Sequence, residues 1–351
     1  MPQEVTHVAS LGARLAVAAA TIAFVAGACG SAPTSTLTAT ASPSGSATGS
    51  ISTPTLPPSE GPTASAPATP TIGATTTPGP SPSPTLRGGL PDFSHVYVII
   101  MENQEYGSIV GSSAAPYLNS LIARYGGATS FYAETHPSEP NYIALTSGGL
   151  QGTNSDGSYN LAAPNLFDQV EAAGRTWHVY AQGYPGNCYT PYIAAAVTDG
   201  PGAPGEYVRK HNPANSYTSI SSKPASCANI TKLAGFDPAA ADFEMIIPNQ
   251  INDMHSSSVA AGDAFLKVFV PRIVDSAAFQ GSVVFITWDE GSTSVKGGGH
   301  IATVVLSPGM TPGARYTGSA THYSMLRTIE QAWGLAYLGE ANNSTAIALP
   351  Y

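Results

Sequence analysis

Polar side chains that could bind a cation or transfer a proton come directly after apolar segments that lie far apart in the sequence. These side chains are Glu102 and Asn103, Asp253 and His255, Asp289 and Glu290, and, after three glycines, His300. Carboxylate and amide oxygens suit hard or borderline divalent cations, and histidine is the commonest general acid or base. One such segment alone is usually a solvated turn, whereas several that meet in space would form a metal site with acid-base groups beside it.

Ser138 stands at the expected beginning of a short helix, and its hydroxyl has two interpretations. Pro140 suits a first helical turn and Gly148 a helix end, so Ser138 would be the N-cap residue. In the first interpretation the hydroxyl only caps the helix. In the second it is a nucleophile, because a helix N-terminus binds phosphate through free backbone N–H groups and a metal-bound serine can attack phosphorus.

The segments that must position these groups alternate between apolar strands and amphipathic helices. Strands are predicted at 95–101, 176–181, 243–247, 283–288 and 302–306. Helices are predicted at 116–124, 165–174, 258–276 and 322–334. Strands that are apolar throughout and separated by helices predict an α/β fold, a three-layer α/β/α sandwich with a mostly parallel central sheet. Ligands bind outside the carboxyl ends of the strands in such sheets, so the polar groups should meet at one edge.

The charge balance restricts the class of partner. The 351 residues include 13 Lys and Arg against 22 Asp and Glu, a formal net charge of −9. Affinity for nucleic acid comes largely from cationic side chains that neutralise phosphates. We therefore expect no nucleic-acid partner and no basic surface for anionic membranes.

Residues 1–29 resemble a bacterial export signal. Arg14 precedes an apolar run of about 14 residues, which suits a signal peptide and is shorter than the roughly 20 residues of a membrane-spanning helix. The run ends in Ala-Gly-Ala-Cys29, which resembles a lipobox whose cysteine is lipidated. An ordinary cleaved signal with an incidental cysteine is the alternative. Both predict an exported protein, extracellular or in the cell envelope, and the lipobox adds a membrane anchor.

Residues 30–90 differ in composition from the rest of the chain. Between 30 and 86 there is no aromatic residue, and Glu60 is the one charged residue among Pro, Ser, Thr, Ala and Gly. Such a segment cannot bury enough apolar surface to offset its ordering entropy, so we expect it to be disordered. It would tether a folded domain formed by residues 91–351.

Cys188 and Cys227 lie in a Gly-, Pro- and Tyr-rich insertion, roughly residues 183–232. In an exported protein two such cysteines are expected to form a disulfide, which would close a loop of about 40 residues. The alternative is a pair of free thiols.

Six short motifs follow one another between residues 93 and 338. They are Glu102-Asn103 and the segments 136–142, 248–255, 287–291, 297–300 and 322–330. Together they resemble the bacterial phosphoesterase family of secreted acid phosphatases and phospholipases C, and most closely its phosphatidylinositol-3-phosphatase-like acid phosphatases. The resemblance implies an alkaline-phosphatase-like fold, whose core is an α/β/α sandwich, in agreement with the pattern of strands and helices.

The resemblance also implies a metal site that contains the nucleophile. One divalent metal ion, of a kind that the motifs do not specify, would be bound by Glu102, Asn103, Ser138, Asp289 and Glu290. Ser138 would attack phosphorus and form a phosphoserine intermediate.

Roles for further residues follow from the same resemblance. The other candidate catalytic residues are His255, His300 and Asp253, and the candidate substrate-binding residues are Asn141, His136 and His322. A histidine would protonate the leaving alkoxide and then activate the water that hydrolyses the phosphoserine. If that histidine must be cationic, activity should favour acidic to neutral pH.

We therefore expect an exported, metal-assisted phosphoesterase that acts on a soluble phosphate ester or a lipid head group as a monomer. The first hypothesis is a phosphomonoesterase of the acid-phosphatase type. A phospholipase C would use the same site, but such relatives usually carry further C-terminal domains and this chain stops at Tyr351. A non-catalytic, tethered surface-binding protein is the third hypothesis, which the complete set of site residues disfavours.

Overall fold

The computed structural model describes residues 86–189 and 207–348. The predicted signal peptide with Cys29, nearly all of the predicted tether and part of the predicted insertion lie outside these residues. Among the helices of the described residues, none is both long enough and apolar enough to cross a membrane.

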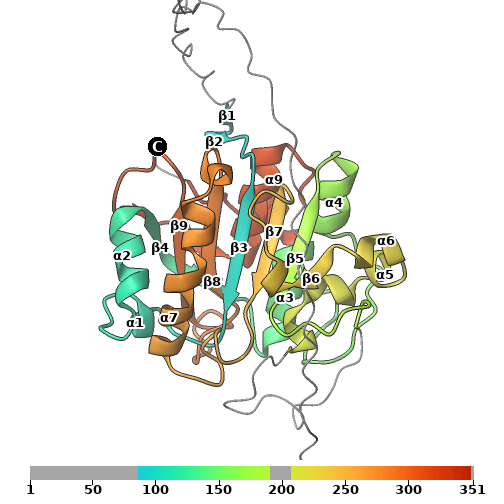
Figure 1. The fold of residues 1–351 in the computed structure, drawn as a ribbon, viewed down its shortest axis with the longest axis horizontal. Helices are drawn as coiled ribbons and strands as arrows, with labels where there is room; N and C mark the ends of the chain where they lie inside the picture. Colours follow the sequence, from blue (N-terminus) through green and yellow to red (C-terminus); the bar gives the residue numbers. More distant parts are fainter. Residues whose placement is uncertain (1–85, 190–206, 349–351) are drawn as a thin grey trace, which may run out of the picture. The chain divides into compact units, whose positions relative to one another are not determined.

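A nine-stranded sheet forms the centre of the domain (Figure 1). In spatial order its strands are β10 (Ala314–Tyr316), β4 (Gly126–Tyr132), β9 (His300–Leu306), β8 (Val283–Trp288), β3 (Val96–Met101), β7 (Phe243–Ile247), β5 (Trp177–Ala181) and β6 (Ile230–Lys232), with β11 (Ala320–Thr321) also paired to β4. Strand β9 is antiparallel to β4 and β8, and the other pairs of this sheet are parallel. A separate ribbon consists of β1 (Leu86–Arg87) and β2 (Leu90–Pro91).

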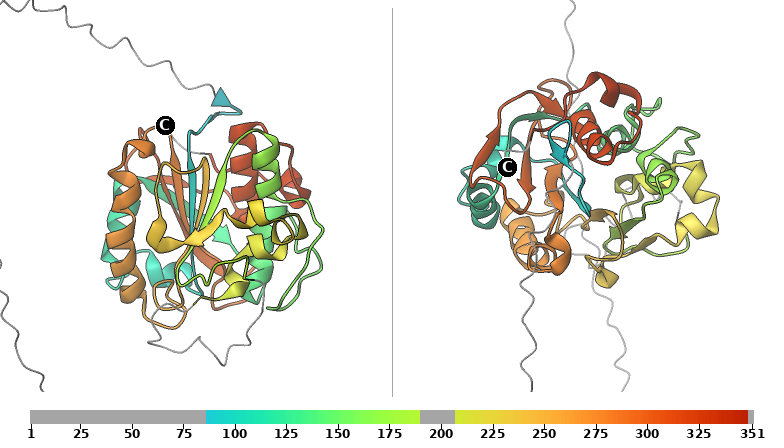
Figure 2. Two further views of the ribbon diagram at one scale, coloured as in Figure 1. Left: turned by 45° about the vertical axis from the view of Figure 1, so that its right-hand side comes forward. Right: turned by 90° about the horizontal axis from the view of Figure 1, so that it is seen from above.

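Helices lie on both faces of the sheet, which confirms the expected three-layer α/β/α sandwich (Figure 2). On one face α2 (Pro116–Arg124) packs against α7 (Val259–Phe269). On the other face α3 (Ser138–Ser147) packs against α4 (Leu166–Ala172) and α9 (His322–Trp333). The shorter helices are α1 (Tyr106–Ile109), α5 (Thr218–Ser221), α6 (Pro224–Cys227) and α8 (Pro271–Val274).

Each of the five predicted strands is present, as β3, β5, β7, β8 and β9. Every residue of β3, β7 and β8 is buried, because helices cover both faces of these central strands. The single helix predicted at 258–276 is wrong: Pro271, which has no backbone N–H, separates α7 from α8.

Strand β4 is an element that the sequence pattern did not predict. It begins with Gly126 and Gly127, two residues of low strand propensity. A Cβ atom on Gly126 would lie 2.5 Å from the carbonyl oxygen of Ala314, and one on Gly127 would lie 2.7 Å from that of Thr303. Glycine is required there because β10 and β9 approach β4 so closely.

Cys188 and Cys227 form the expected disulfide, with their Cα atoms 5.2 Å apart. The bond joins the segment after β5 to the end of α6. It therefore closes the chain around the short 3-10 turns Arg209–His211 and Pro213–Ser216, which contribute to the site described below.

Glu244 is a charged residue in the buried strand β7. Its side chain is fully buried, and Oε2 has no hydrogen-bond partner in the described part of the chain. Burial raises the pKa of Glu244 from 4.5 to about 8. Because this folded-state pKa exceeds that of the unfolded chain, the stability linked to Glu244 is complete below pH 4.5 and is lost as the pH rises to about 8.

Glu244→Gln should therefore stabilise the protein at pH 8, by on the order of 3 kcal/mol, and have little effect at pH 5. Urea unfolding at the two pH values measures the difference. The exposed Glu340→Gln serves as the control and should change the stability little at either pH value. An equal effect of Glu244→Gln at both pH values would contradict the raised pKa of Glu244 in the folded protein.

Candidate active site

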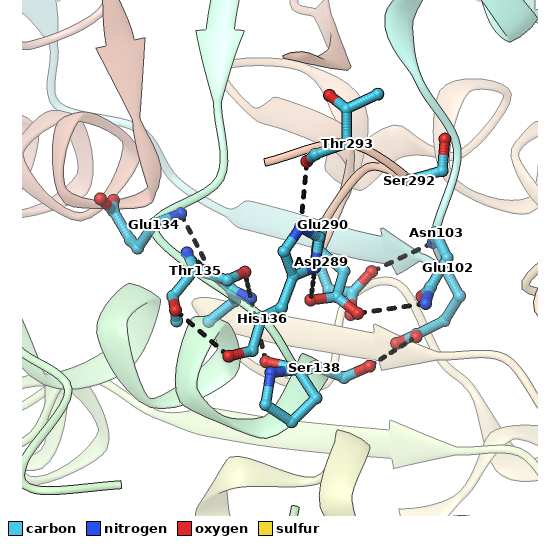
Figure 3. Close-up of polar contacts among 12 residues, drawn as sticks. Glu102, Asn103, Glu134, Thr135, His136, Ser138, Asp289, Glu290, Ser292 and Thr293 are labelled. Atoms are coloured by element: carbon cyan, nitrogen blue, oxygen red, sulfur yellow. Dashed lines mark hydrogen bonds and ion pairs between the residues drawn. The ribbon is translucent and has the colours of Figure 1, made fainter. Parts of the chain in front are cut away.

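The carboxyl ends of the central strands bring the predicted metal ligands together (Figure 3). Glu102 and Asn103 follow β3, and Asp289 and Glu290 follow β8. The Oγ atom of Ser138, at the beginning of α3, lies 3.2 Å from Oε2 of Glu102. The backbone N–H of Asn103 donates to Oδ1 of Asp289 at 3.2 Å, and its side-chain amide donates to Oε1 of Glu290 at 3.1 Å. All five residues thus belong to one cluster.

Ser138 is the first residue of α3 and not its N-cap, which corrects the capping interpretation. Pro137 occupies the N-cap position, and the carboxylate of Asp156 accepts a hydrogen bond from the backbone N–H of Glu139 at 3.0 Å. Because Asp156 satisfies this end of the helix, the Ser138 hydroxyl is left to face Glu102. A nucleophile that attacks a phosphate bound at the helix N-terminus would need this placement.

The cluster gathers carboxylates whose burial disfavours the ionised form. Glu102, Asp253 and Asp289 are each 1% exposed or less. Burial, followed by the charges of Asp289 and Asp253, raises the pKa of Glu102 well above its ordinary value. Burial likewise raises the pKa of Asp289 to about 6. Carboxylates this close and this buried are stable in the ionised form when a cation neutralises them.

The donor atoms fit a divalent cation. Oδ1 of Asn103 and Oδ2 of Asp289 are buried and have no hydrogen-bond partner among the residues that the structure describes. In addition, Glu102, His211 and Asp253 each offer a ligand atom, and these three atoms lie within 4.8 Å of one another. The predicted ligands (Glu102, Asn103, Ser138, Asp289 and Glu290) and this second group share Glu102. Together they offer oxygens and one imidazole nitrogen, a combination that divalent cations accept.

His211 belongs to this site although it lies outside the six sequence motifs. Its Nε2 lies 3.2 Å from Oε1 of Glu102, and its Nδ1 lies 3.7 Å from Oδ2 of Asp253. Its ring stacks on Tyr142, whose hydroxyl donates to Glu102. Burial, then the charges of Lys210 and His255, lowers the pKa of His211 well below its ordinary value, so the ring is neutral at pH 7.

His255 lies at the exposed rim of the same site. Its ring centroid is 6.4 Å from that of His211. Its backbone N–H donates to Oδ1 of Asp253 at 2.8 Å, so Asp253 holds the turn that presents His255. The structure thus places His255 where a group could exchange protons with solvent, and the catalytic role itself remains a prediction.

His136 and His322 each contact the segment that carries Asp289 and Glu290. Nδ1 of His136 lies 2.8 Å from Oε2 of Glu290, and its Nε2 lies 3.0 Å from the carbonyl oxygen of Thr293 (Figure 3). Nε2 of His322 lies 2.7 Å from the carbonyl oxygen of Asp289. His322 is fully buried as the first residue of α9, and burial lowers its pKa to about 4. Both histidines hold in place a segment that carries candidate metal ligands, and substrate contact by either stays a prediction.

Asn141 and His300 make other contacts. The Asn141 amide bonds to backbone groups of the loop 134–137 that leads to Ser138. His300 begins β9, and because β9 is antiparallel to its neighbours this residue does lie at the expected edge. Its ring stacks against Tyr106 and Tyr132 at centroid distances of 4.4 and 4.9 Å. No contact in the described part of the chain joins His300 to Ser138, so the catalytic role expected of His300 stays a prediction.

A buried ion pair joins the nucleophile helix to the segment that carries His211. Arg209 donates to Oε1 of Glu139, and their side chains are 2% and 0% exposed. The same guanidinium donates to the carbonyl oxygens of Gly157 and Tyr159 at 3.2 and 2.9 Å. Since Glu139 follows Ser138 and Arg209 lies two residues before His211, this pair fixes the two parts of the site relative to each other.

Arg209→Met should destabilise the protein by about 3 to 5 kcal/mol at pH 8, because it leaves Glu139 buried without a counter-charge. The loss should be smaller at pH 5: burial raises the pKa of Glu139 to about 7, so the carboxyl can be protonated there. Urea unfolding at both pH values measures the losses. The partly exposed Arg175, paired with Asp92 at 2.6 Å, provides the control Arg175→Met. Equal losses for Arg209→Met at both pH values would refute the explanation.

The chain is similar to several known proteins. The sequence pattern of the Phosphoesterase family matches residues 112–336. The chain is 33% identical over 260 residues to a phosphatidylinositol-3-phosphatase of Mycobacterium tuberculosis, an alignment that covers 74% of this chain and 83% of that protein. It is 26% identical over 258 residues to an acid phosphatase of Aspergillus fumigatus. That alignment covers 70% of this chain and 56% of the fungal protein.

The fold has solved counterparts as well. It resembles the phosphonate monoester hydrolase SpPMH from Silicibacter pomeroyi with a TM-score of 0.50 and 12% sequence identity, covering 72% of this chain and 76% of that chain. At this identity the similarity concerns the fold alone. From the family match and the phosphatase relatives, this chain belongs to the phosphoesterase family and is a hydrolase of phosphoric esters.

Proposed function

We propose that this protein is a metal-assisted phosphomonoesterase of the acid-phosphatase type that works through a phosphoserine on Ser138. The observation that carries the proposal is the placement of the Ser138 hydroxyl at the N-terminus of α3, 3.2 Å from Glu102 and inside the carboxylate cluster. The phosphatase names of the relatives support a monoester substrate.

In the first step Ser138 Oγ attacks phosphorus and gives its proton to Oε2 of Glu102, which accepts its hydrogen bond, as the bond from phosphorus to the ester oxygen breaks. The N-terminus of α3 stabilises the anionic substrate through its dipole. A divalent cation bound by the Asn103, Asp289 and Glu102 oxygens would neutralise phosphate oxygens and lower the pKa of the serine. Such chemistry depends mainly on positioning and charge neutralisation.

The leaving alkoxide takes a proton from His255, at the solvent-exposed rim of the site. Water then attacks the phosphoserine, and the same histidine, now neutral, accepts a proton of that water. The bond from phosphorus to Ser138 Oγ breaks, inorganic phosphate leaves, and Ser138 recovers its proton from Glu102. His211, whose ring lies beside that of His255, is neutral. It therefore places no positive charge there that would oppose protonation of His255.

Phosphorus NMR of the chain incubated with a phosphatidylinositol phosphate and phosphatidylcholine tests the reaction class. Inorganic phosphate as the product, at a rate that depends on Ser138, is the expected result. Phosphocholine as the product would instead show a phospholipase C. If no product forms with any of the divalent cations tested, the non-catalytic hypothesis remains.

We further propose that residues 1–29 export the protein, that Cys29 is lipidated and that residues 30–85 tether a monomeric domain to the cell envelope. The small residues before Cys29 and the Pro/Ser/Thr-rich composition of the tether support this. Cys29→Ser should release the protein from the membrane fraction in a bacterial host. Unchanged membrane association of this variant would overturn lipid anchoring.

A further inference from the structure

Lys210 places a permanent positive charge at the nucleophile end of α3. It lies between Arg209 and His211 in a 3-10 turn, and its side chain is 11% exposed. Its Nζ donates to Oδ2 of Asp156 at 3.0 Å, while Oδ1 of the same carboxylate accepts the backbone N–H of Glu139. One carboxylate therefore holds the ammonium group beside the first turn of α3, where Ser138 lies.

The segment of Lys210 borders the carboxylate cluster. Lys210 directly precedes His211, whose Nε2 lies 3.2 Å from Oε1 of Glu102. The ammonium group of Lys210 is paired with the carboxylate of Asp156 at 3.0 Å, and an ion-paired lysine is cationic at neutral pH. A positive charge therefore lies next to the segment that reaches Glu102.

The hydrogen bonds of Lys210 leave capacity for a ligand. An ammonium group has three N–H donors, and in the described part of the chain Asp156 accepts one of them. The neighbouring Arg209 is different: its guanidinium bonds to Glu139 and to three backbone carbonyls, of Gly157, Tyr159 and Asn215. Of these two adjacent cations, Lys210 is the one with donors left for an anion.

We infer that Lys210 binds a non-bridging oxygen of the substrate phosphate and thereby selects phosphate monoesters over diesters; this rests on the proposed function of the site. A monoester dianion carries one more negative charge and one more non-bridging oxygen than a diester. A cation bound by the carboxylate cluster would offset part of that charge, and the ammonium of Lys210 supplies the remainder in a buried site, where it is most effective.

The test compares two substrates that share a leaving group, p-nitrophenyl phosphate and methyl p-nitrophenyl phosphate, on the full chain with divalent cation. Lys210→Met should reduce kcat/KM for the monoester by about 100-fold or more and for the diester by less than 10-fold. Lys210→Arg should recover most of the monoester activity because it restores the charge. Lys267→Met, at an exposed position on α7, is the charge-matched control and should change neither value.

Equal losses on both substrates, or none on either, would overturn the inference. Thermal unfolding of the variants separates a folding defect from a loss of substrate recognition. A low melting temperature of Lys210→Met with an unchanged ratio of the two activities would count against the inference.

Binding of inorganic phosphate, measured by calorimetry, gives a readout without turnover. Lys210→Met should weaken it by at least about 10-fold, and unchanged affinity would overturn the role of Lys210 even in an active enzyme. If the wild type binds phosphate through Lys210 but hydrolyses neither ester, the proposed function fails and the phosphate contact stands.

Discussion

Ser138→Ala should reduce turnover of phosphate monoesters by roughly 10,000-fold or more, because it removes the atom that forms the bond to phosphorus. The free energy of unfolding should change by only about 1 kcal/mol, the net contribution of one hydrogen bond to Glu102. The change is small because Asp156, and not Ser138, caps α3. Steady-state kinetics and urea unfolding measure the two quantities.

Ser147→Ala is the matched control, since Ser147 is also buried in α3 and bonds to the carbonyl oxygen of Ile143 at 2.8 Å. It should cost a similar amount of stability and leave turnover within about 3-fold of wild type. Near-normal turnover in Ser138→Ala would remove Ser138 from the mechanism, whereas a comparable loss of activity in both variants would indicate damage to the helix.

Removal of divalent cation should abolish activity, and Asp289→Asn should reproduce that loss by at least about 1,000-fold in the presence of cation. Oδ2 of Asp289 is buried without a hydrogen-bond partner in the described residues, so its charge is available to a cation. In the stripped protein the same substitution should be stabilising, because it removes one of several mutually repelling buried carboxylates. Chelation, cation add-back and thermal unfolding check these expectations.

Cation binding should also be visible in stability. At a cation concentration roughly 100-fold above Kd the wild type should gain about 3 kcal/mol, and Asp289→Asn should gain much less. Asp263→Asn is a suitable control: Asp263 is a buried carboxylate on α7 that accepts the backbone N–H groups of Tyr117 and Leu118. It should weaken the protein and leave the cation effect intact. Full activity after chelation, with no cation-dependent stabilisation, would contradict a metal site.

The strands, and the candidate ligands that meet at their carboxyl ends, could be predicted from the sequence because each depends on a local pattern. Buried strands such as β3 and β8 are apolar throughout, and Glu102 and Asp289 follow them directly. Strand β4 could not be found in this way, since Gly126 and Gly127 have low strand propensity and are required only by the close approach of β9 and β10.

His211 could not be placed from sequence because its position depends on long-range contacts. The ion pair between Arg209 and Glu139, and the disulfide that closes its segment, bring it to Glu102 across about a hundred residues of chain. A signal was nevertheless present. Arg209, Lys210 and His211 are three consecutive basic residues in a chain with 13 Lys and Arg, and such a cluster beside an acidic site points to anion binding.

Similarly, the sequence could not decide between a capping and a nucleophilic hydroxyl at Ser138. The decision depends on Asp156, which lies 18 residues further along the chain and supplies the cap. Local propensity describes the end of a helix well but does not reveal which side chain from elsewhere will satisfy it.

The phosphoserine itself can be sought by quenching the enzyme with acid during turnover of a phosphate monoester and locating the phosphoryl group by peptide mass spectrometry. A phosphoryl group on Ser138 in the wild type, and none in Ser138→Ala, is the predicted result. Continued turnover by the wild type with no phosphoryl group on Ser138 at any quench time, or with the group on another residue, would contradict the mechanism proposed for this site.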